Sequence, residues 1–279
     1  MRSASLVLVS LTFVVPGCRP APPEASDALA AAFSGEGAVW VDLSYAYDDR
    51  TVFWPTAKPF ELEVVAAGMT EGGYYYAAND FSMAEHGGTH LDAPVHFAEG
   101  KHTADQIPLD RLIGAAVVVD VSEAAATNPD YQVQVSDIEA WEREYGLIPV
   151  GAILLLRTGW GTRWPDRERY LGTALSGPEA VPQLHFPGLH PDAARWLVEH
   201  RRIDAVGIDT PSIDFGQSTL FESHRMLFAD DVPAFENVAG LDVMPSIGAY
   251  VIALPMKIAG GSGGPLRMVG LIPQERSRR

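Results

Sequence analysis

The chain has 279 residues and a formal net charge of −16, because 36 aspartates and glutamates outnumber 20 lysines and arginines. So acidic a chain is a poor partner for nucleic acid or for an anionic membrane surface, and we expect neither. Cys18 is the only cysteine of the sequence, which excludes an internal disulfide.

The N-terminal residues have the pattern of an export signal. Arg2 supplies a positive charge, Leu6 to Val15 form an apolar run too short to span a bilayer comfortably, and a glycine precedes Cys18. The residues around Cys18 resemble a bacterial lipobox. They predict a lipoprotein signal peptide over residues 1–17 and a lipid anchor at Cys18 as the sole membrane attachment. An ordinary signal peptide with an incidental cysteine is the alternative. We expect an exported protein of the bacterial cell envelope or periplasm.

Beyond the signal we expect one folded domain. Residues 18–37 contain several prolines and alanines and predict a flexible tether, residues 38–272 the domain, and residues 273–279 a tail. The first half of the domain is predicted to be mainly β, and the continuous apolar run of its last strand is typical of a strand covered on both faces. The strands expected there are Val39–Leu43, Phe60–Val65, Tyr74–Ala77 and Ala115–Val121.

In the second half of the domain, helices alternate with strands. Ser136 and Glu139 form a capping box that begins a helix, and Gly146 is placed to end it. Pro191 suits the first turn of another helix that ends near His200. The remaining elements expected are a short helix at Phe221–Phe228 and strands at Ala152–Leu156, Ala205–Ile208, Tyr250–Leu254 and Leu266–Leu271. This pattern predicts the α/β class, as a single domain with a mixed, largely β core and flanking helices.

The segment from His86 to His96 has the composition of a metal site. It reads His86-Gly87-Gly88-Thr89-His90-Leu91-Asp92-Ala93-Pro94-Val95-His96. His90 and Asp92 are two apart and leave the same face of an extended chain, and His96 continues that phase. The two glycines predict a tight turn that brings His86 round to the others. Imidazole with carboxylate suits zinc, manganese or iron, and a bound cation offsets the cost of burying Asp92.

Three ligands leave a metal ion under-coordinated or open, so more distant residues come into question. His224 and Glu236 stand out, Glu236 because it is a charged residue between apolar neighbours. Taken alone, each suits a surface or capping position better than a metal site. The polar turn Asp209 to Asp214 follows a buried strand, and α/β sheets commonly place ligand contacts at the carboxyl ends of strands.

The pattern His-x-Gly-Thr-His-x-Asp-x-Pro-x-His resembles the signature of the metal-dependent cyclase family, which includes bacterial kynurenine formamidases and isatin hydrolases. The resemblance covers roughly residues 38 to 272 and implies a swivelling β/β/α-like domain. Its later segments are Leu156–Gly159, Gly207–Asp214, His224–Glu236 and Gly264–Arg267.

This resemblance implies a ligand set for the metal. His86, His90 and Asp92 would bind it, and His224 with Glu236 would complete one or two metal positions. Asp92 would bridge the ions in a two-metal form. The cofactor would be zinc or manganese, as one or two ions. The resemblance also implies a homodimer or a larger homo-oligomer.

The implied function is that of a metal-dependent amidohydrolase. Metal-activated water would cleave the carbon–nitrogen bond of a small-molecule substrate, either an aryl formamide such as N-formylkynurenine or a cyclic amide such as isatin. His96 would be the acid/base residue, with Glu236 as the other group that could relay the proton. The segments Trp40–Asp80 and Trp160–Pro187 are longer than in compact formamidases and look more like those of isatin hydrolases. Residues that could wall a flat substrate are Phe53, Trp54, Tyr75, Tyr76, Phe81 and Trp160.

Other functions stay open at this point. A lactone or ester hydrolase of the same family would use the same residues, and a non-catalytic lipoprotein could bind a metal or small ligand. His96 discriminates, because a pure binding site does not require a further titratable group. The run Gly260 to Gly264 around Ser262 matches the nucleophile elbow of serine hydrolases, but a strand is expected after it and no histidine follows His224. We interpret it as a glycine turn near the site.

Overall fold

A computed structural model of the chain describes Phe33 and residues 37–274. The predicted signal peptide, Cys18, almost all of the tether and nearly the whole tail lie outside the described residues. Within the described part, no helix combines the length and the apolar composition needed to cross a bilayer.

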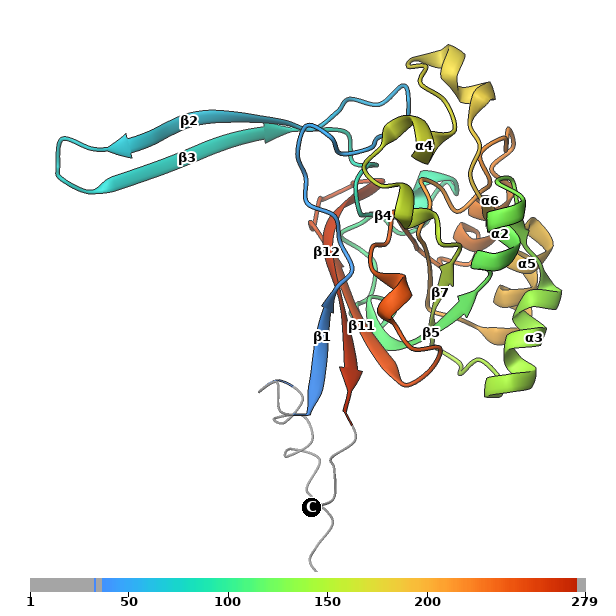
Figure 1. Cartoon of the computed structure of the whole chain (residues 1–279). Helices are drawn as coiled ribbons and strands as arrows, with labels where there is room; N and C mark the ends of the chain where they lie inside the picture. The colour runs from blue at the N-terminus through green and yellow to red at the C-terminus, as the bar shows by residue number, and fades with distance from the viewer. Residues whose placement is uncertain (1–32, 34–36, 275–279) are drawn as a thin grey trace, which may run out of the picture.

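One large sheet dominates the domain and closes on itself (Figure 1). Its strand order is β1-β12-β11-β5-β7-β9-β10-β4, and β4 also pairs with β12, which joins seven strands into a barrel and leaves β1 outside the ring. The neighbours β5, β7, β9 and β10 run parallel, and the other pairs run antiparallel. The strands are β1 (Ala38–Asp42), β4 (His90–Asp92), β5 (Ile113–Asp120), β7 (Ile153–Arg157), β9 (Ala205–Ile208), β10 (Ala234–Glu236), β11 (Ala249–Pro255) and β12 (Gly263–Pro273).

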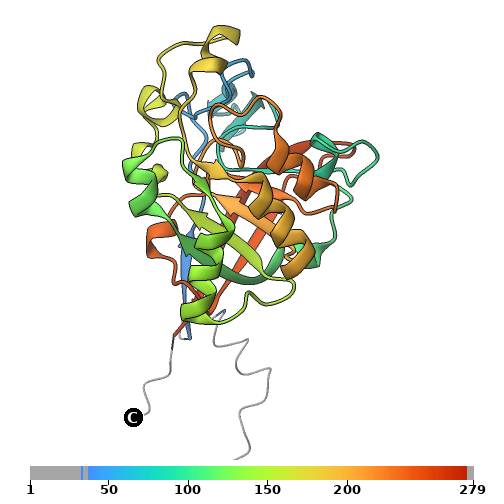
Figure 2. The same ribbon diagram turned by 90° about the vertical axis from the view of Figure 1, so that its right-hand side faces the viewer.

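Helices cover the outer face of the parallel strands, as the view in Figure 2 shows. The α-helices are α2 (Ser122–Thr127), α3 (Val135–Tyr145), α4 (Arg167–Leu171), α5 (Pro191–Arg201) and α6 (Glu222–Phe228). Short 3-10 helices lie at η1 (Pro94–His96), η2 (Leu109–Arg111), η3 (Trp160–Arg163), η4 (Pro178–Gln183) and η5 (Leu241–Val243).

The strand β7 shows how the core is divided. Leu154 and Leu156 pack with the helices on the outer side, whereas Ile153 and Leu155 pack into the barrel interior. Successive side chains of a strand point to opposite faces, so a strand covered on both sides must be apolar at every position. The predicted doubly covered strand over 115–121 has the same character in β5.

A long hairpin projects away from the barrel (Figure 1). It consists of β2 (Glu61–Met69) and β3 (Tyr75–Ser82), paired antiparallel. All but its last two residues belong to the segment Trp40–Asp80 that was expected to be long, and several of its apolar side chains are exposed. A small parallel pair is formed by β6 (Gln132–Val133) and β8 (Gly188–Leu189). The predicted homo-oligomer stays a prediction.

The expected α/β domain with a largely β core and flanking helices is confirmed. The expected capping box is wrong in its residues. The helix begins earlier, at Val135, because the Asp137 carboxylate accepts the Gln134 N–H at 2.8 Å and Gln134 is the capping residue. Gly146 does follow the last helical residue. The strands β4 and β10 were missed, since elements this short carry no periodic pattern.

Candidate metal centre

Two short antiparallel strands bring the first ligating groups together. His90 and Asp92 leave the same face of β4, and Glu236 on β10 lies directly opposite His90 in the strand register. Directly opposite residues on one face are close neighbours. His90 Nε2 lies 3.1 Å from Asp92 Oδ1 and 3.4 Å from Glu236 Oε2. All three side chains are buried.

The orientation of the His90 ring leaves one nitrogen for a ligand. Its Nδ1–H donates to the Gly88 carbonyl at 3.0 Å, so Nε2 faces the two carboxylates. Within the described part of the chain, this buried Nε2 has no hydrogen-bond partner. A nitrogen lone pair enclosed with carboxylates is unfavourable unless a proton or a cation lies between them. His90, Asp92 and Glu236 therefore fit a divalent ion such as zinc or manganese.

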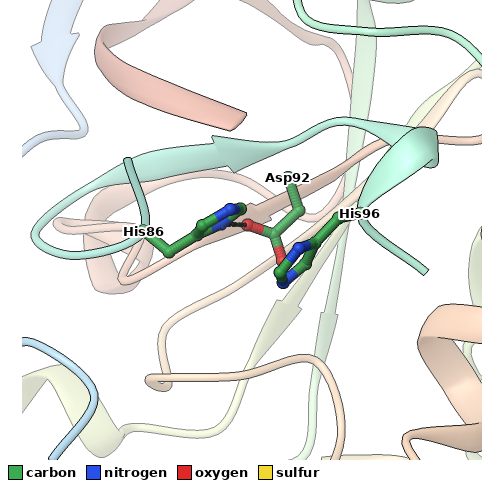
Figure 3. Close-up of side chains that lie close together, drawn as sticks. All are labelled: His86, Asp92 and His96. Carbon is green, nitrogen blue, oxygen red and sulfur yellow. Dashed lines mark hydrogen bonds and ion pairs between the residues drawn. The ribbon is translucent and has the colours of Figure 1, made fainter. Parts of the chain in front are cut away.

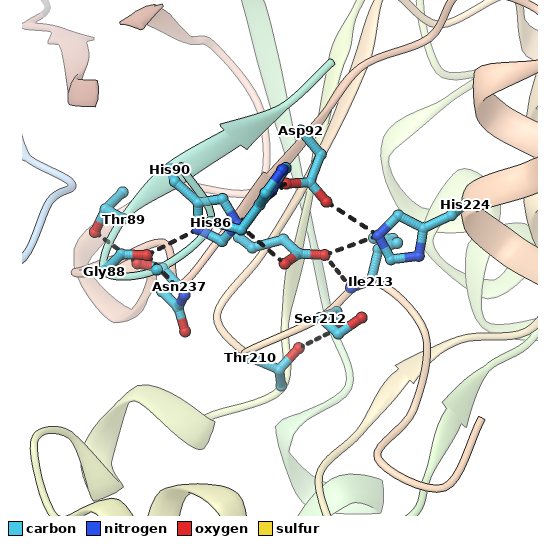
Figure 4. Close-up of polar contacts among 12 residues, drawn as sticks. His86, Gly88, Thr89, His90, Asp92, Thr210, Ser212, Ile213, His224 and Asn237 are labelled. Atoms are coloured by element: carbon cyan, nitrogen blue, oxygen red, sulfur yellow. Dashed lines mark hydrogen bonds and ion pairs between the residues drawn. The ribbon is translucent and has the colours of Figure 1, made fainter. Parts of the chain in front are cut away.

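His224 reaches the same place from α6. Its Nε2 lies 3.1 Å from both Asp92 Oδ2 and Glu236 Oε1. Figure 4 shows the His224 ring turned toward Asp92. Its other ring nitrogen, Nδ1, donates to Asp214 Oδ2 at 2.6 Å. The Ile213 N–H donates to Glu236 Oε1 at 2.7 Å and holds that carboxylate in place. A carboxylate behind a ligating histidine fixes its tautomer and ring orientation.

The predicted glycine turn is present and returns His86 to the site. Gly88 has a φ of 58°, a conformation that favours glycine. His86 Nδ1 lies 2.6 Å from Asp92 Oδ1 (Figure 3). Asp92 therefore contacts His86 and His90 through Oδ1 and His224 through Oδ2, which suits a bridging carboxylate.

His96 does not continue the phase of the strand, because β4 ends at Asp92 and Pro94 begins the 3-10 helix η1. The expected extended phase is wrong there. The imidazole of His96 nonetheless faces the site, where it stacks on His86 with ring centroids 3.9 Å apart and planes 20° apart. These two residues and Asp92 form a second group of side chains that could hold an ion.

The electrostatics of the site separate His96 from His90. Burial lowers the pKa of His96 to about 4, with the Asp92 charge opposing the shift, so the imidazole is neutral at physiological pH. Burial also lowers the pKa of His90, but Asp92 and Glu236 outweigh it and raise the value to about 9. Burial and the charge of Asp92 raise the pKa of Glu236. The buried ligand cluster thus attracts positive charge, while His96 stays neutral.

A cavity of about 300 Å³ opens over these groups, and all six predicted site residues line it. Phe53 and Trp54 line it too, as expected. The other expected wall residues do not. Tyr75 and Tyr76 are exposed on the hairpin, and Trp160 is buried in a separate apolar cluster. Phe97 and Phe221 were not predicted as wall residues, yet they line the cavity and stack with ring centroids 5.0 Å apart.

The segment expected as an insertion supports the aromatic wall of the cavity. Tyr170 and Phe186 within it are fully buried, and Trp54 packs against their cluster. The Trp54 and Phe186 rings pack edge to face, with their centroids 6.4 Å apart. The turn after β9 also lies where it was expected, since Pro211 and Ser212 line the cavity.

Two residues behind the ligands had no individual role in the prediction, although Asp214 ends the polar turn where ligand contacts were expected. Asp214 holds His224, and the Asn237 side-chain amide donates to the Gly88 carbonyl at 2.7 Å, the same carbonyl that holds His90. Asp214 belongs to the segment Gly207–Asp214, which carries the family resemblance, so the sequence did contain a signal that could have identified it. Asn237 follows Glu236 directly, but an isolated amide gives no signal by itself.

Comparisons with known proteins identify the family and the fold of the chain. A family model described as "Putative cyclase" matches residues 41–215. An isatin hydrolase of Roseibium aggregatum is 35% identical over 72% of this chain and 77% of that protein. A kynurenine formamidase of Bacillus cereus is 29% identical over 82% of this chain and 96% of its own length. The structure of isatin hydrolase A from Ralstonia solanacearum superposes with a TM-score of 0.81 at 30% identity, over 91% of this chain and 99% of that one.

Proposed function

The chain belongs to the cyclase family, and from this premise we propose that it is a metal-dependent hydrolase that cleaves a carbon–nitrogen amide bond in a flat aromatic substrate. The substrate is a cyclic amide such as isatin or an aryl formamide such as N-formylkynurenine. The observation that carries the proposal is the convergence of three histidines, two carboxylates and the neutral His96 on one aromatic-walled cavity.

The ligand roles follow from which atoms face one another. His90, Asp92 and Glu236 would hold one ion, and His86 and His224 extend the set on either side of Asp92. When bound there, zinc or manganese would supply a Lewis acid for the carbonyl and lower the pKa of a water molecule. Glu236 is better placed as a ligand than as a proton carrier, because Ile213 and His224 already hold its Oε1.

Proton transfer is assigned to His96. Amide hydrolysis requires a group that takes a proton as water adds to the carbonyl and gives it to the leaving nitrogen. His96 lines the cavity beside the ligand cluster, and burial keeps its imidazole neutral, so one ring nitrogen carries a lone pair for that proton. Its stacking on His86 and its edge contact with Phe97 hold the ring in place.

The cavity supports a small aromatic substrate. Its volume of about 300 Å³ is at the lower end of the range of roughly 300–1,000 Å³ for small-molecule sites. Trp54, Phe97 and Phe221 present ring surfaces against which a planar substrate would pack favourably.

The test is a comparison of substrates with the metal-reconstituted protein. Isatin, N-formylkynurenine and a simple lactone are each assayed with zinc and with manganese. The proposal expects metal-dependent turnover of at least one of the two amides, faster than turnover of the lactone. Hydrolysis of the lactone alone would contradict the amide assignment and favour the ester-cleaving alternative. Tight metal binding without any turnover would favour a binding protein.

A further inference from the structure

Ser262, in the glycine-rich turn, lies beside His86 because β12 pairs with β4. Gly263 lies opposite Asp92 in the register, and the Ala93 N–H donates to the Ser262 carbonyl at 2.9 Å. The approach is so close that a Cβ on Gly263 would lie 2.6 Å from His86 Cε1. Glycine at this position therefore allows the turn to pack directly against the imidazole.

The contacts of Ser262 look at first like a nucleophilic triad. Ser262 Oγ lies 2.9 Å from His86 Nε2, and His86 Nδ1 lies 2.6 Å from Asp92 Oδ1. In a serine hydrolase the histidine would take the hydroxyl proton, and the serine would attack the substrate. A nucleophile elbow needs a helix directly after the serine, whereas strand β12 begins here at Gly263.

Two contacts argue against a nucleophile. The Ser262 hydroxyl donates to Glu85 Oε2 at 2.7 Å, and the Ser262 backbone N–H donates to the same oxygen at 3.0 Å. A hydroxyl has one hydrogen, and a carboxylate can only accept. Ser262 therefore donates its hydroxyl hydrogen to Glu85 and has none left to give to His86. Among the described residues, the lining of the cavity includes His86 but not Ser262.

We propose that Ser262 and Glu85 are positioning residues that set the tautomer of His86. With its hydrogen given to Glu85, the Ser262 oxygen accepts the His86 Nε2–H, which leaves the lone pair of Nδ1 facing Asp92. This inference rests on the proposed metal-dependent function, since Nδ1 is then the atom whose lone pair is offered to the ion.

The arrangement is the reverse of that at the other two histidines. Both His90 and His224 are held through Nδ1–H, by Gly88 and Asp214, and turn Nε2 to the site. His86 is held through Nε2–H and turns Nδ1 to the site. Such partners of a ligating histidine typically change metal affinity by about 10- to 100-fold when they are removed.

The test compares Ser262→Ala, Ser262→Thr and Glu85→Ala with the wild type. Ser82→Ala is the matched control, because Ser82 also donates its hydroxyl to a glutamate, Glu61, but on the hairpin. We expect Ser262→Ala to weaken zinc binding by about 10- to 100-fold and excess zinc to restore its turnover. Ser262→Thr keeps the hydroxyl and should retain most of the affinity. Glu85→Ala should resemble Ser262→Ala, because the freed hydroxyl can then donate to His86.

A spectroscopic measurement reports the tautomer directly. In the zinc-loaded protein, ¹⁵N NMR should show a hydrogen on His86 Nε2 in the wild type and its loss or rapid exchange in Ser262→Ala. Loss of turnover by Ser262→Ala with normal zinc affinity would identify a nucleophile and overturn the inference. If Ser262→Ala has unchanged zinc affinity, unchanged turnover and an unchanged His86 signal, the inference about the tautomer is overturned, and the proposed metal-dependent function is unaffected. A wild type that binds no ion would overturn both.

Discussion

Asp214 holds His224 by the ring nitrogen that faces away from the site, with Oδ2 at 2.6 Å from Nδ1. The same carboxylate accepts the backbone N–H groups of Ser223 and His224 at 3.1 Å each. One buried side chain thus fixes both the first turn of α6 and the rotation of the imidazole within it. A negative charge at a helix N-terminus is also favourable in itself.

Asp214→Asn should therefore weaken metal binding. The variant keeps the shape of the side chain but loses the charge that orients Nδ1–H, and an outer partner of this kind is typically worth about 10- to 100-fold in affinity. The measurement is a competition titration with a chromophoric chelator. Asp130→Asn is the matched control, because Asp130 pairs with His185 Nδ1 at 2.9 Å outside the cavity. Equal affinities of the two variants would contradict the role of Asp214.

Metal affinity should fall as the pH is lowered. In the ion-free site, Asp92 and Glu236 outweigh burial and raise the pKa of His90 to about 9, so His90 carries a proton below that pH. An ion must displace this proton, which weakens apparent binding by up to about tenfold for each pH unit below about 9. Titration calorimetry in buffers of different ionisation enthalpy should show proton release. An affinity that does not change between about pH 6 and pH 8 would contradict this charge balance.

His96→Ala should lower kcat and leave metal content unchanged. His96 faces the cavity as a neutral base, and loss of a general acid–base group typically reduces the rate by about 10²- to 10⁴-fold. Metal content is measured on the same preparation. His102→Ala is the control, since His102 lies beside Asp231 and does not line the cavity. Loss of the ion from His96→Ala would instead make His96 a ligand.

Trp54→Ala should raise KM more than it lowers kcat. Trp54 lines the cavity, and an aromatic contact is worth about 0.5–1.5 kcal/mol beyond area burial, or roughly a twofold to thirteenfold change in KM. Tyr75→Ala is a control for the wall expected from the sequence, because Tyr75 is 65% exposed on the hairpin. If Tyr75→Ala raises KM and Trp54→Ala does not, the wall of the cavity has been assigned to the wrong residues.

The main elements of the fold were predictable because they are long enough to show a pattern. The apolar run of β5 and the capping and glycine signals of α3 gave correct element types. The closure of the barrel was not predictable, because it depends on the three-residue strand β4 pairing with β10 on one side and with β12 on the other. Pairings of this kind join residues far apart in the sequence, and no local propensity encodes them.

The candidate site divides in the same way. His90 and Asp92 were predicted to share a face from their spacing, and the structure places them so. That His224 and Glu236 would join them came from family resemblance, because the local sequence around each residue suits a surface or capping position better than a metal site. Of all parts of the candidate site, the wall of the cavity was predicted least accurately from the sequence. Composition identifies aromatic residues but not their direction, so exposed Tyr76 was included and Phe221 was missed.

The most direct test of a metal-dependent amide hydrolase is turnover measured against bound metal. The protein is stripped with a chelator, and zinc or manganese is added back in steps while hydrolysis of isatin and N-formylkynurenine is followed and bound metal is determined. We predict negligible turnover in the stripped protein and a rise in proportion to bound metal, with saturation at one or two ions per chain. Full turnover of either amide by the metal-free protein would contradict the account.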